Sequence, residues 1–179
     1  MGNNNTSLKS TMNLGLILGV ILMILHLLFW LVNHDGVKYS ALINYTAIAI
    51  CIFKGTKSFR DEERGGIMSY GQALRFGANT GFFSSVVYAL FFYVFITVID
   101  PEFIERARLL TEESMYNLGS TEEDIDLIMS IKEVFQNPVL WAISEIITFS
   151  FIGFVVSLIT SIFVKNEGDP FNTNRSEIK

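Results

Sequence analysis

The sequence contains very few of the side chains that hold metals and cofactors. Its single cysteine, Cys51, excludes an internal disulfide and leaves no thiolate cluster for zinc or an iron–sulfur centre. The two histidines, His26 and His34, are too few for a histidine-rich metal site. We therefore expect no metal, no cofactor and no catalytic residue.

Positive charge and catalytic motifs are also scarce. The formal net charge of −5 disfavours nucleic acid as a partner, because phosphate binding requires a basic patch. The glycine pair Gly65-Gly66 is not followed by the Lys-Ser/Thr of a phosphate-binding loop. No nucleophile elbow, kinase signature or zinc-protease helix occurs. The sequence therefore gives no support for an enzyme.

Apolar side chains, by contrast, are abundant. Half of the 179 residues are hydrophobic, including 16 Phe, and the mean hydropathy is positive. Four apolar runs predict transmembrane helices at about 14–32, 37–56, 73–99 and 138–164. We therefore predict an all-α membrane protein with four transmembrane helices.

Two of the predicted helices have an alternative interpretation. Residues 14–32 resemble a signal peptide, but this run is longer than the usual apolar core of about 7–15 residues. The residues that follow the run, Asn33-His34-Asp35-Gly36, do not form a small-residue cleavage site. We therefore expect this segment to be retained. Residues 37–56 are the weakest prediction, because lysines flank a short apolar run that could instead lie at the membrane interface.

The segment between the third and fourth apolar runs is acidic. We predict that residues 101–136 form two amphipathic helices joined at Gly119, with Asp100 capping the first. Ser120-Thr121-Glu122-Glu123 matches a capping box for the second. The polar ends, 1–13 and 165–179, are predicted to be disordered tails.

Lysine and arginine are distributed unequally over this topology. Only four of the 13 lie on the side of the acidic segment, and these are Lys38, Arg106, Arg108 and Lys132. The other nine lie on the side of the two termini. Basic residues are enriched on the cytoplasmic side of membrane proteins. We therefore predict that both termini lie in the cytoplasm and that the acidic hairpin lies outside.

Several short motifs resemble those of one family of small bacterial membrane proteins. They are Lys57-Ser58-Phe59-Arg60-Asp61, then Gly65-Gly66, then the run Ser69-Tyr70-Gly71-Gln72-Ala73-Leu74-Arg75-Phe76-Gly77, and finally Asn137-Pro138 with Glu145, Gly153 and Ser157. In this order they resemble the family catalogued as domain of unknown function 4199, over about residues 14–165. The resemblance implies a bacterial inner-membrane protein with four helices and no established activity.

Small residues recur at every fourth position in three of the predicted helices. They are Gly15 and Gly19 in the first, Gly77, Gly81 and Ser85 in the third, and Gly153 and Ser157 in the fourth. Small residues allow helix backbones to approach closely within a membrane. These rows predict helix packing, either within one chain or along the seam of a homodimer.

Four polar residues are expected at one depth in the membrane. Glu145, His26, Asn44 and Tyr93 each lie about six residues from the predicted outer end of their helix. Ionisable residues inside a membrane usually face the bundle interior. Each of the four could find a separate partner with a structural role only. Alternatively, they form a polar network, or a site that handles protons or a substrate.

These observations leave two hypotheses for function. The first is a non-enzymatic accessory or assembly protein that packs in the lipid bilayer against a membrane-protein partner or a second copy. The alternative is a small oligomeric transporter or channel that uses Glu145 and His26. An accessible cavity at Glu145 would favour the alternative, and a sealed apolar environment would favour the first hypothesis.

Overall fold

The computed structural model describes residues 2–32, 40–134 and 136–168, with side chains for all of these except 2–6 and 129–134. This part of the chain is helical and contains no strand, apart from one isolated bridge between Met68 and Asn166. In chain order the elements are α1 (Gly2–Val32), α2 (Ser40–Ser58), the π-helical turn η1 (Phe59–Glu63), α3 (Tyr70–Val94), the π-helical turn η2 (Phe95–Ile99), α4 (Phe103–Asn117), α5 (Glu122–Val134) and α6 (Pro138–Val164).

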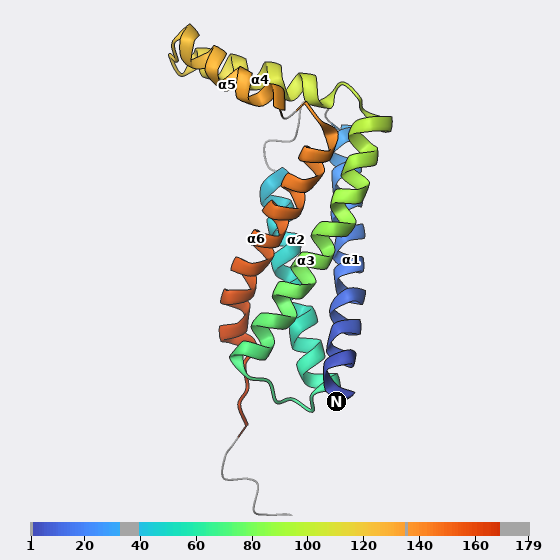
Figure 1. Ribbon diagram of the computed structural model, residues 1–179. Helices are drawn as coiled ribbons and strands as arrows, with labels where there is room; N and C mark the ends of the chain where they lie inside the picture. The colour runs from blue at the N-terminus through green and yellow to red at the C-terminus, as the bar shows by residue number, and fades with distance from the viewer. Residues whose placement is uncertain (1, 33–39, 135, 169–179) are drawn as a thin grey trace, which may run out of the picture.

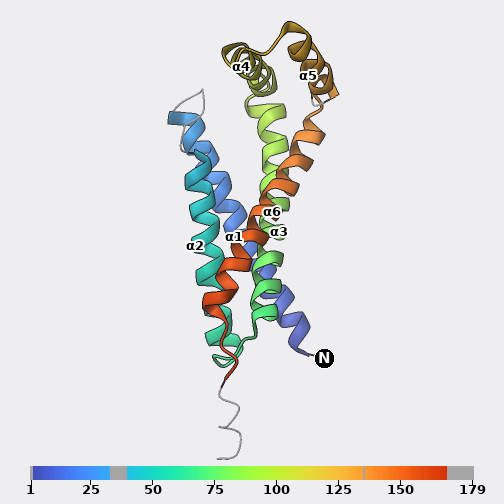
Figure 2. The same ribbon diagram turned by 90° about the vertical axis from the view of Figure 1, so that its left-hand side faces the viewer.

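Four long helices form an elongated bundle, and a pair of shorter ones lies across one end (Figure 1). Helix α3 packs most extensively, against α6 and α1, while α2 contacts α1, α3 and α6. Helices α4 and α5 are joined at Gly119, whose φ of +78° requires glycine. At the end covered by this pair, which we call the hairpin end, α1 and α2 lean away from α3 and α6 (Figure 2).

Three helical segments are long and apolar enough to cross a membrane. They are Ser7–Val32, Tyr70–Ile99 and Pro138–Val164. Three such segments indicate a multi-pass membrane protein. Helix α2 is not among them, and residues 33–39, where the predicted second span begins, lie outside the described residues. The spanning role of α2 therefore stays a prediction.

The prediction of a disordered tail at residues 1–13 is wrong for residues 2–13, which continue α1. Two observations explain why α1 begins earlier than predicted. The Ser10 hydroxyl donates to the Glu63 carboxylate at 2.8 Å, and the Thr11 side chain is fully buried. At the other terminus, residues 165–168 lie beside the loop after η1, through the bridge between Met68 and Asn166. Residues 169–179 of the predicted second tail lie outside the described residues.

The capping groups also differ from prediction on both sides of Gly119. Helix α4 begins at Phe103 without a side-chain cap, and the Asp100 carboxylate binds other groups, described below. The cap of α5 is Thr121, whose hydroxyl oxygen accepts the Asp124 backbone N–H at 3.2 Å. The acidic side chain that interacts with this cap is thus Asp124, one residue beyond the predicted Glu123. By contrast, α6 begins at Pro138, as the sequence predicts.

Candidate functional site

The predicted small-residue rows lie where the helix backbones come closest. A Cβ atom added to Gly81 would lie 2.9 Å from the Cα of Gly153, which is nearer than real Cβ contacts occur. Gly15 and Gly19 of α1 are equally close to α3, where added Cβ atoms would lie 2.6 Å from the Phe83 Cβ and 2.7 Å from the Val87 Cβ. Glycine at these positions therefore sets the spacing of α1, α3 and α6.

Serine hydroxyls extend the contact between α3 and α6. Ser85 and Ser150 share a hydrogen bond of 2.8 Å across the two helices. Gly77 lies directly against the side chain of Ser157, whose hydroxyl donates to the Gly153 carbonyl at 2.6 Å. Every one of these groups is satisfied within a single chain, so the close contact requires no second copy.

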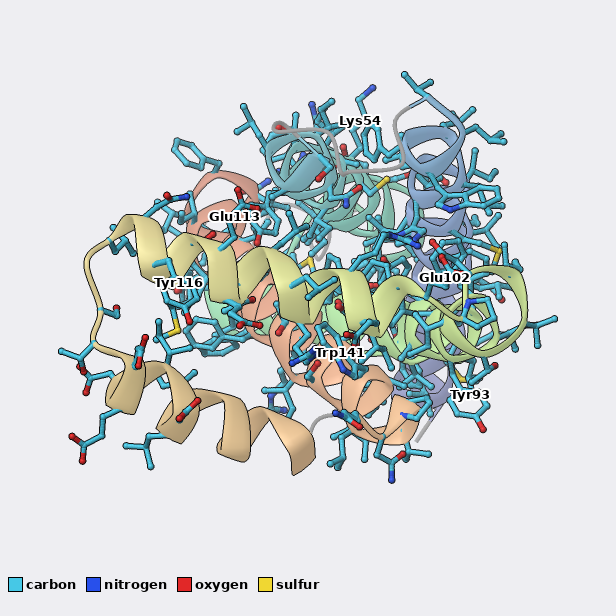
Figure 3. All side chains as sticks on the ribbon, turned by 90° about the horizontal axis from the view of Figure 1, so that it is seen from above. Lys54, Tyr93, Glu102, Glu113, Tyr116 and Trp141 are labelled. Atoms are coloured by element: carbon cyan, nitrogen blue, oxygen red, sulfur yellow. The ribbon has the colours of Figure 1, made fainter. Side chains whose placement is uncertain are left out.

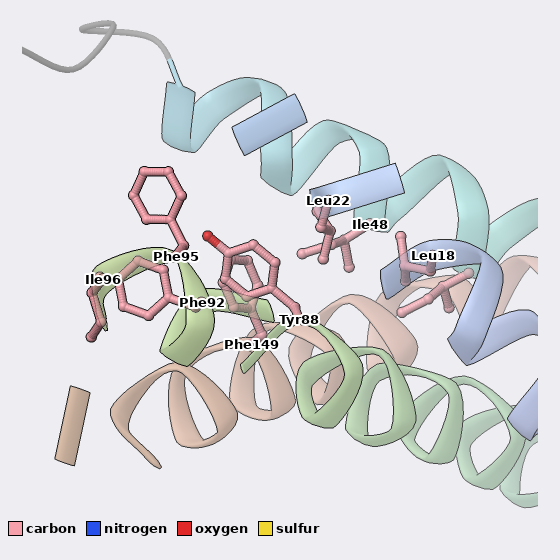
Figure 4. Close-up of a cluster of buried hydrophobic side chains, with 9 residues drawn as sticks. Leu18, Leu22, Ile48, Tyr88, Phe92, Phe95, Ile96 and Phe149 are labelled. Carbon is pink, nitrogen blue, oxygen red and sulfur yellow. The ribbon is translucent and has the colours of Figure 1, made fainter. Parts of the chain in front are cut away.

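Towards the hairpin end the small residues give way to a cluster of large apolar side chains. Leu18 and Leu22 of α1, Ile48 of α2, Phe92 of α3 and Phe149 of α6 meet in this cluster (Figure 4). Aromatic rings are wider than the glycine contacts allow. The helices are therefore held further apart here than at Gly81.

A cavity of about 360 Å³ lies above this cluster, at the hairpin end. All four bundle helices and α4 contribute to its wall. Its polar lining includes His26 of α1, Asn44 of α2 and Glu145 of α6, together with Asp100 before α4 and Arg106 in α4. The divergence of α1 and α2 from α3 and α6 provides the space (Figure 2).

Glu145 and Asn44 present unused hydrogen-bond acceptors at this cavity. Among the described residues, no hydrogen bond or ion pair engages the Glu145 carboxylate, although the residue is mostly shielded by the fold. The Oδ1 atom of Asn44 is buried and has no hydrogen-bond donor within the described part of the chain. Buried acceptors such as the Asn44 Oδ1 are normally paired, so a donor from outside the described residues would complete the site.

His26 is held in place by α3. Its Nδ1 shares a hydrogen bond of 2.8 Å with the Tyr88 hydroxyl. Its ring also lies edge-on to Phe95, with the ring centroids 4.4 Å apart. The orientation of the imidazole is therefore fixed by this hydrogen bond and by edge-on contacts with surrounding aromatic rings.

A second polar group ties the α4–α5 pair to the bundle beside the cavity. The Asp100 carboxylate accepts the indole N–H of Trp30 at 3.0 Å and forms an ion pair with Arg106. Asp100 is buried and Arg106 is partly exposed. These contacts join α1, the residue that ends η2 and the first turn of α4. Arg106 also lies 3.8 Å from Glu102.

The structure brings together three of the four residues predicted at this depth. His26, Asn44 and Glu145 all line the cavity, whereas Tyr93 does not. The Tyr93 side chain is 41% exposed and points away from the bundle (Figure 3). Five residues earlier, Tyr88 occupies the inward position.

The number of residues from a helix end gives the depth of a residue but not the direction in which it points around the helix axis. Two residues that are five positions apart, such as Tyr88 and Tyr93, point in directions about 140° apart. The sequence could have predicted that Tyr88 faces inward, because Tyr88 lies three residues beyond Ser85 and therefore on the same helix face as the small residues. Trp30, Asp100 and Arg106 were also missed. The contacts among these three residues depend on how α4 lies over the end of the bundle, and no short sequence motif predicts that position.

Several charged groups away from the cavity form hydrogen bonds or ion pairs. Arg60, next to the cytoplasm in the predicted topology, donates to the Val164 carbonyl at the end of α6, at 2.9 Å. A hydrogen bond from Arg60 also lowers the pKa of Asp61. In α4, a hydrogen bond from Arg108 lowers the pKa of Glu105. Among the described residues no group of three or more His, Cys, Asp or Glu side chains could hold a metal ion.

A bundle of long apolar helices with an interior polar cavity defines an α-helical membrane protein. Within this class, the chain belongs to the protein family of unknown function DUF4199, whose profile matches residues 13–166. The resemblance of the 54–77 motifs to that family is thereby confirmed. No curated protein and no solved structure matches the chain.

Proposed function

We propose that this protein binds a small polar solute in the cavity at the hairpin end, as a step in its transport or sensing. The observation that carries the proposal is the Glu145 carboxylate in the cavity wall, which has no hydrogen bond or ion pair with any described residue. Ionisable residues at membrane depth are costly and commonly mark a substrate or ion pathway. The cavity volume, about 360 Å³, falls in the range of small-molecule sites.

The competing role, an accessory protein that works by helix packing, has less support. Its strongest sequence argument was the rows of small residues, which are engaged within one chain at Gly81 and Gly153. The same contact argues against an open channel through a single chain, because the helices touch there. Passage of a solute would need the helices to separate or a second copy to join.

The proposal includes a membrane topology. We infer that α2 is a fourth span, that both termini are cytoplasmic, and that α4 and α5 lie outside the inner membrane. Support comes from the unequal distribution of lysine and arginine. Helix α2 also runs alongside the three long apolar helices (Figure 1).

Cysteine labelling tests this topology. In a Cys51→Ser background, Asn117→Cys should react with an impermeant maleimide in intact cells. Glu63→Cys should react only after permeabilisation, since residue 63 would face the cytoplasm. Reaction of residue 63 in intact cells would contradict the topology.

Tryptophan fluorescence tests solute binding. Trp30 lines the cavity, so a solute that enters should change its emission. Amines, alcohols and carboxylates are titrated into the purified full chain in nanodiscs. A Trp30→Phe variant, which keeps Trp141, should lose the response while a separation-based assay still detects binding. The absence of a saturable response to every class would refute the proposed function.

A further inference from the structure

We propose that the solute is an organic ammonium ion, meaning a primary or secondary amine carried on an apolar body. This inference rests on the proposed binding function and names the ligand class of the same cavity. Three properties of the cavity lead to it: its unpaired acceptors, its aromatic wall and its charge.

The unpaired acceptors call for a donor. A carboxylate removed from water needs an opposite charge or several hydrogen bonds. The charged and imidazole groups that the structure describes in the wall are already engaged: Arg106 pairs with Asp100, and the His26 Nδ1 pairs with Tyr88. An ammonium ion would bring positive charge and N–H donors to Glu145, and another N–H could reach Asn44.

The aromatic wall suits a cation with an apolar body. Eight of the sixteen lining residues are Phe, Tyr or Trp. All four bundle helices contribute, with Trp30 from α1, Tyr45 from α2, Tyr88 from α3 and Phe149 from α6. Aromatic faces attract cations electrostatically, more strongly when water is excluded. They also bury apolar surface of the ligand.

The balance of charge disfavours an anion. The cavity wall contains two carboxylates, those of Asp100 and Glu145, and one guanidinium, that of Arg106. Because Asp100 and Arg106 neutralise each other, the described residues of the wall offer an anionic solute no further positive charge beside Glu145. A neutral solute could donate hydrogen bonds but would leave the carboxylate charge uncompensated.

The ammonium group could belong to a free amine or to a lipid headgroup such as that of phosphatidylethanolamine. Both present the same chemistry to Glu145. A lipid would reach the cavity from the membrane surface, and a free amine would reach it from water. The lipid composition of the nanodisc separates the two sources.

The experiment compares ligands of matched shape. The full chain is reconstituted in nanodiscs of phosphatidylglycerol only, and 2-phenylethylammonium and 2-phenylethanol are titrated while tryptophan fluorescence is recorded. A carboxylate of similar shape, 3-phenylpropionate, is titrated in the same way. We expect the ammonium ion to bind at least tenfold more tightly than the alcohol or the carboxylate. Glu145→Gln should remove most of this preference. Glu113→Gln, at an exposed carboxylate of α4, should keep it.

The possible outcomes are distinguishable. If the alcohol or 3-phenylpropionate binds as tightly as the ammonium ion, the inference is wrong while the proposed function stands. If no ligand binds, both fail. The ligand comparison on the unaltered protein needs no variant, so misfolding of Glu145→Gln cannot obscure the result.

The lipid arm repeats the titration in nanodiscs that contain phosphatidylethanolamine. A several-fold weaker apparent affinity for 2-phenylethylammonium would show that the headgroup competes for the cavity. An unchanged affinity would assign the site to free amines. Either result leaves the ammonium class intact.

Discussion

In the middle of the bundle a Cβ atom on Gly81 would almost touch the Cα of Gly153, whereas at the hairpin end the same two helices wall a cavity of about 360 Å³. The difference lies in side-chain size. Glycine lets two backbones meet, while Tyr88 and Phe149 hold them apart with their ring centroids at 4.9 Å. One pair of helices therefore provides both a closed contact and a polar cavity.

This contrast assigns different tasks to the two regions. In a membrane, burial of apolar surface gives little drive for helix association, so close packing and interhelical hydrogen bonds must hold the bundle. The contact at Gly81 is of this kind, and we expect it to carry much of the stability. The hairpin end is then free to hold polar groups, such as Glu145, that add little to stability.

The strongest test of the contrast enlarges a residue at the closed contact. Gly81→Leu should destabilise the protein by about 3 kcal/mol, because the backbone of α6 cannot yield locally. The measurement is unfolding of the purified chain in detergent, followed by circular dichroism. Gly71→Leu is the matched control, since nothing lies within 4 Å of an added Cβ there. Equal stability of the Gly81 variant and the unaltered protein would show that this contact is not what holds α3 to α6.

A smaller effect is expected where the α4–α5 pair is attached. Asp100→Ala should cost about 1–3 kcal/mol, because the Trp30 indole N–H and Arg106 lose their acceptor. Protease cleavage within α4 or α5 should also become faster. Glu105→Ala, which removes an exposed partner of Arg108, should change neither measurement. Identical behaviour of the two variants would mean that Asp100 does not anchor the pair.

The hydrogen bond between Ser85 of α3 and Ser150 of α6 should contribute still less to stability. A double-mutant cycle with Ser85→Ala and Ser150→Ala should give a coupling energy of about 0.6 kcal/mol, typical of hydrogen bonds between membrane helices. The unfolding assay provides the four stabilities. A coupling energy of zero would indicate that the hydroxyls bond elsewhere in the protein.

The smallest effect on stability is expected at the cavity. Ala41→Leu adds the same side chain as Gly81→Leu but places it at the cavity wall. Its stability should stay within about 0.5 kcal/mol of the unaltered protein, because exposed sites without special contacts tolerate change. Binding of 2-phenylethylammonium should nevertheless weaken. Strong destabilisation at Ala41 would contradict the difference between the two regions.

Several features could be predicted from local patterns because their physical causes are local. Apolar runs predict the long helices, and Asn137-Pro138 predicts the start of α6. Spacing by fours places Gly77, Gly81 and Ser85 on one helix face. The first turns of α1 escaped prediction because their polar sequence carries no such pattern. They are helical through contacts such as Ser10 with Glu63, which is distant in sequence.

The amino-acid sequence by itself determined the class of protein, the position of its long helices and the depth of His26, Asn44 and Glu145, since hydrophobicity and helical rise depend only on neighbouring residues. Only the tertiary structure decided that Tyr88, rather than Tyr93, faces these residues, and that Asp100 binds Trp30 and Arg106 instead of capping α4. Rotation about a helix axis and the return of α4 over the bundle arise from packing between helices. Packing depends on all the contacting surfaces at once.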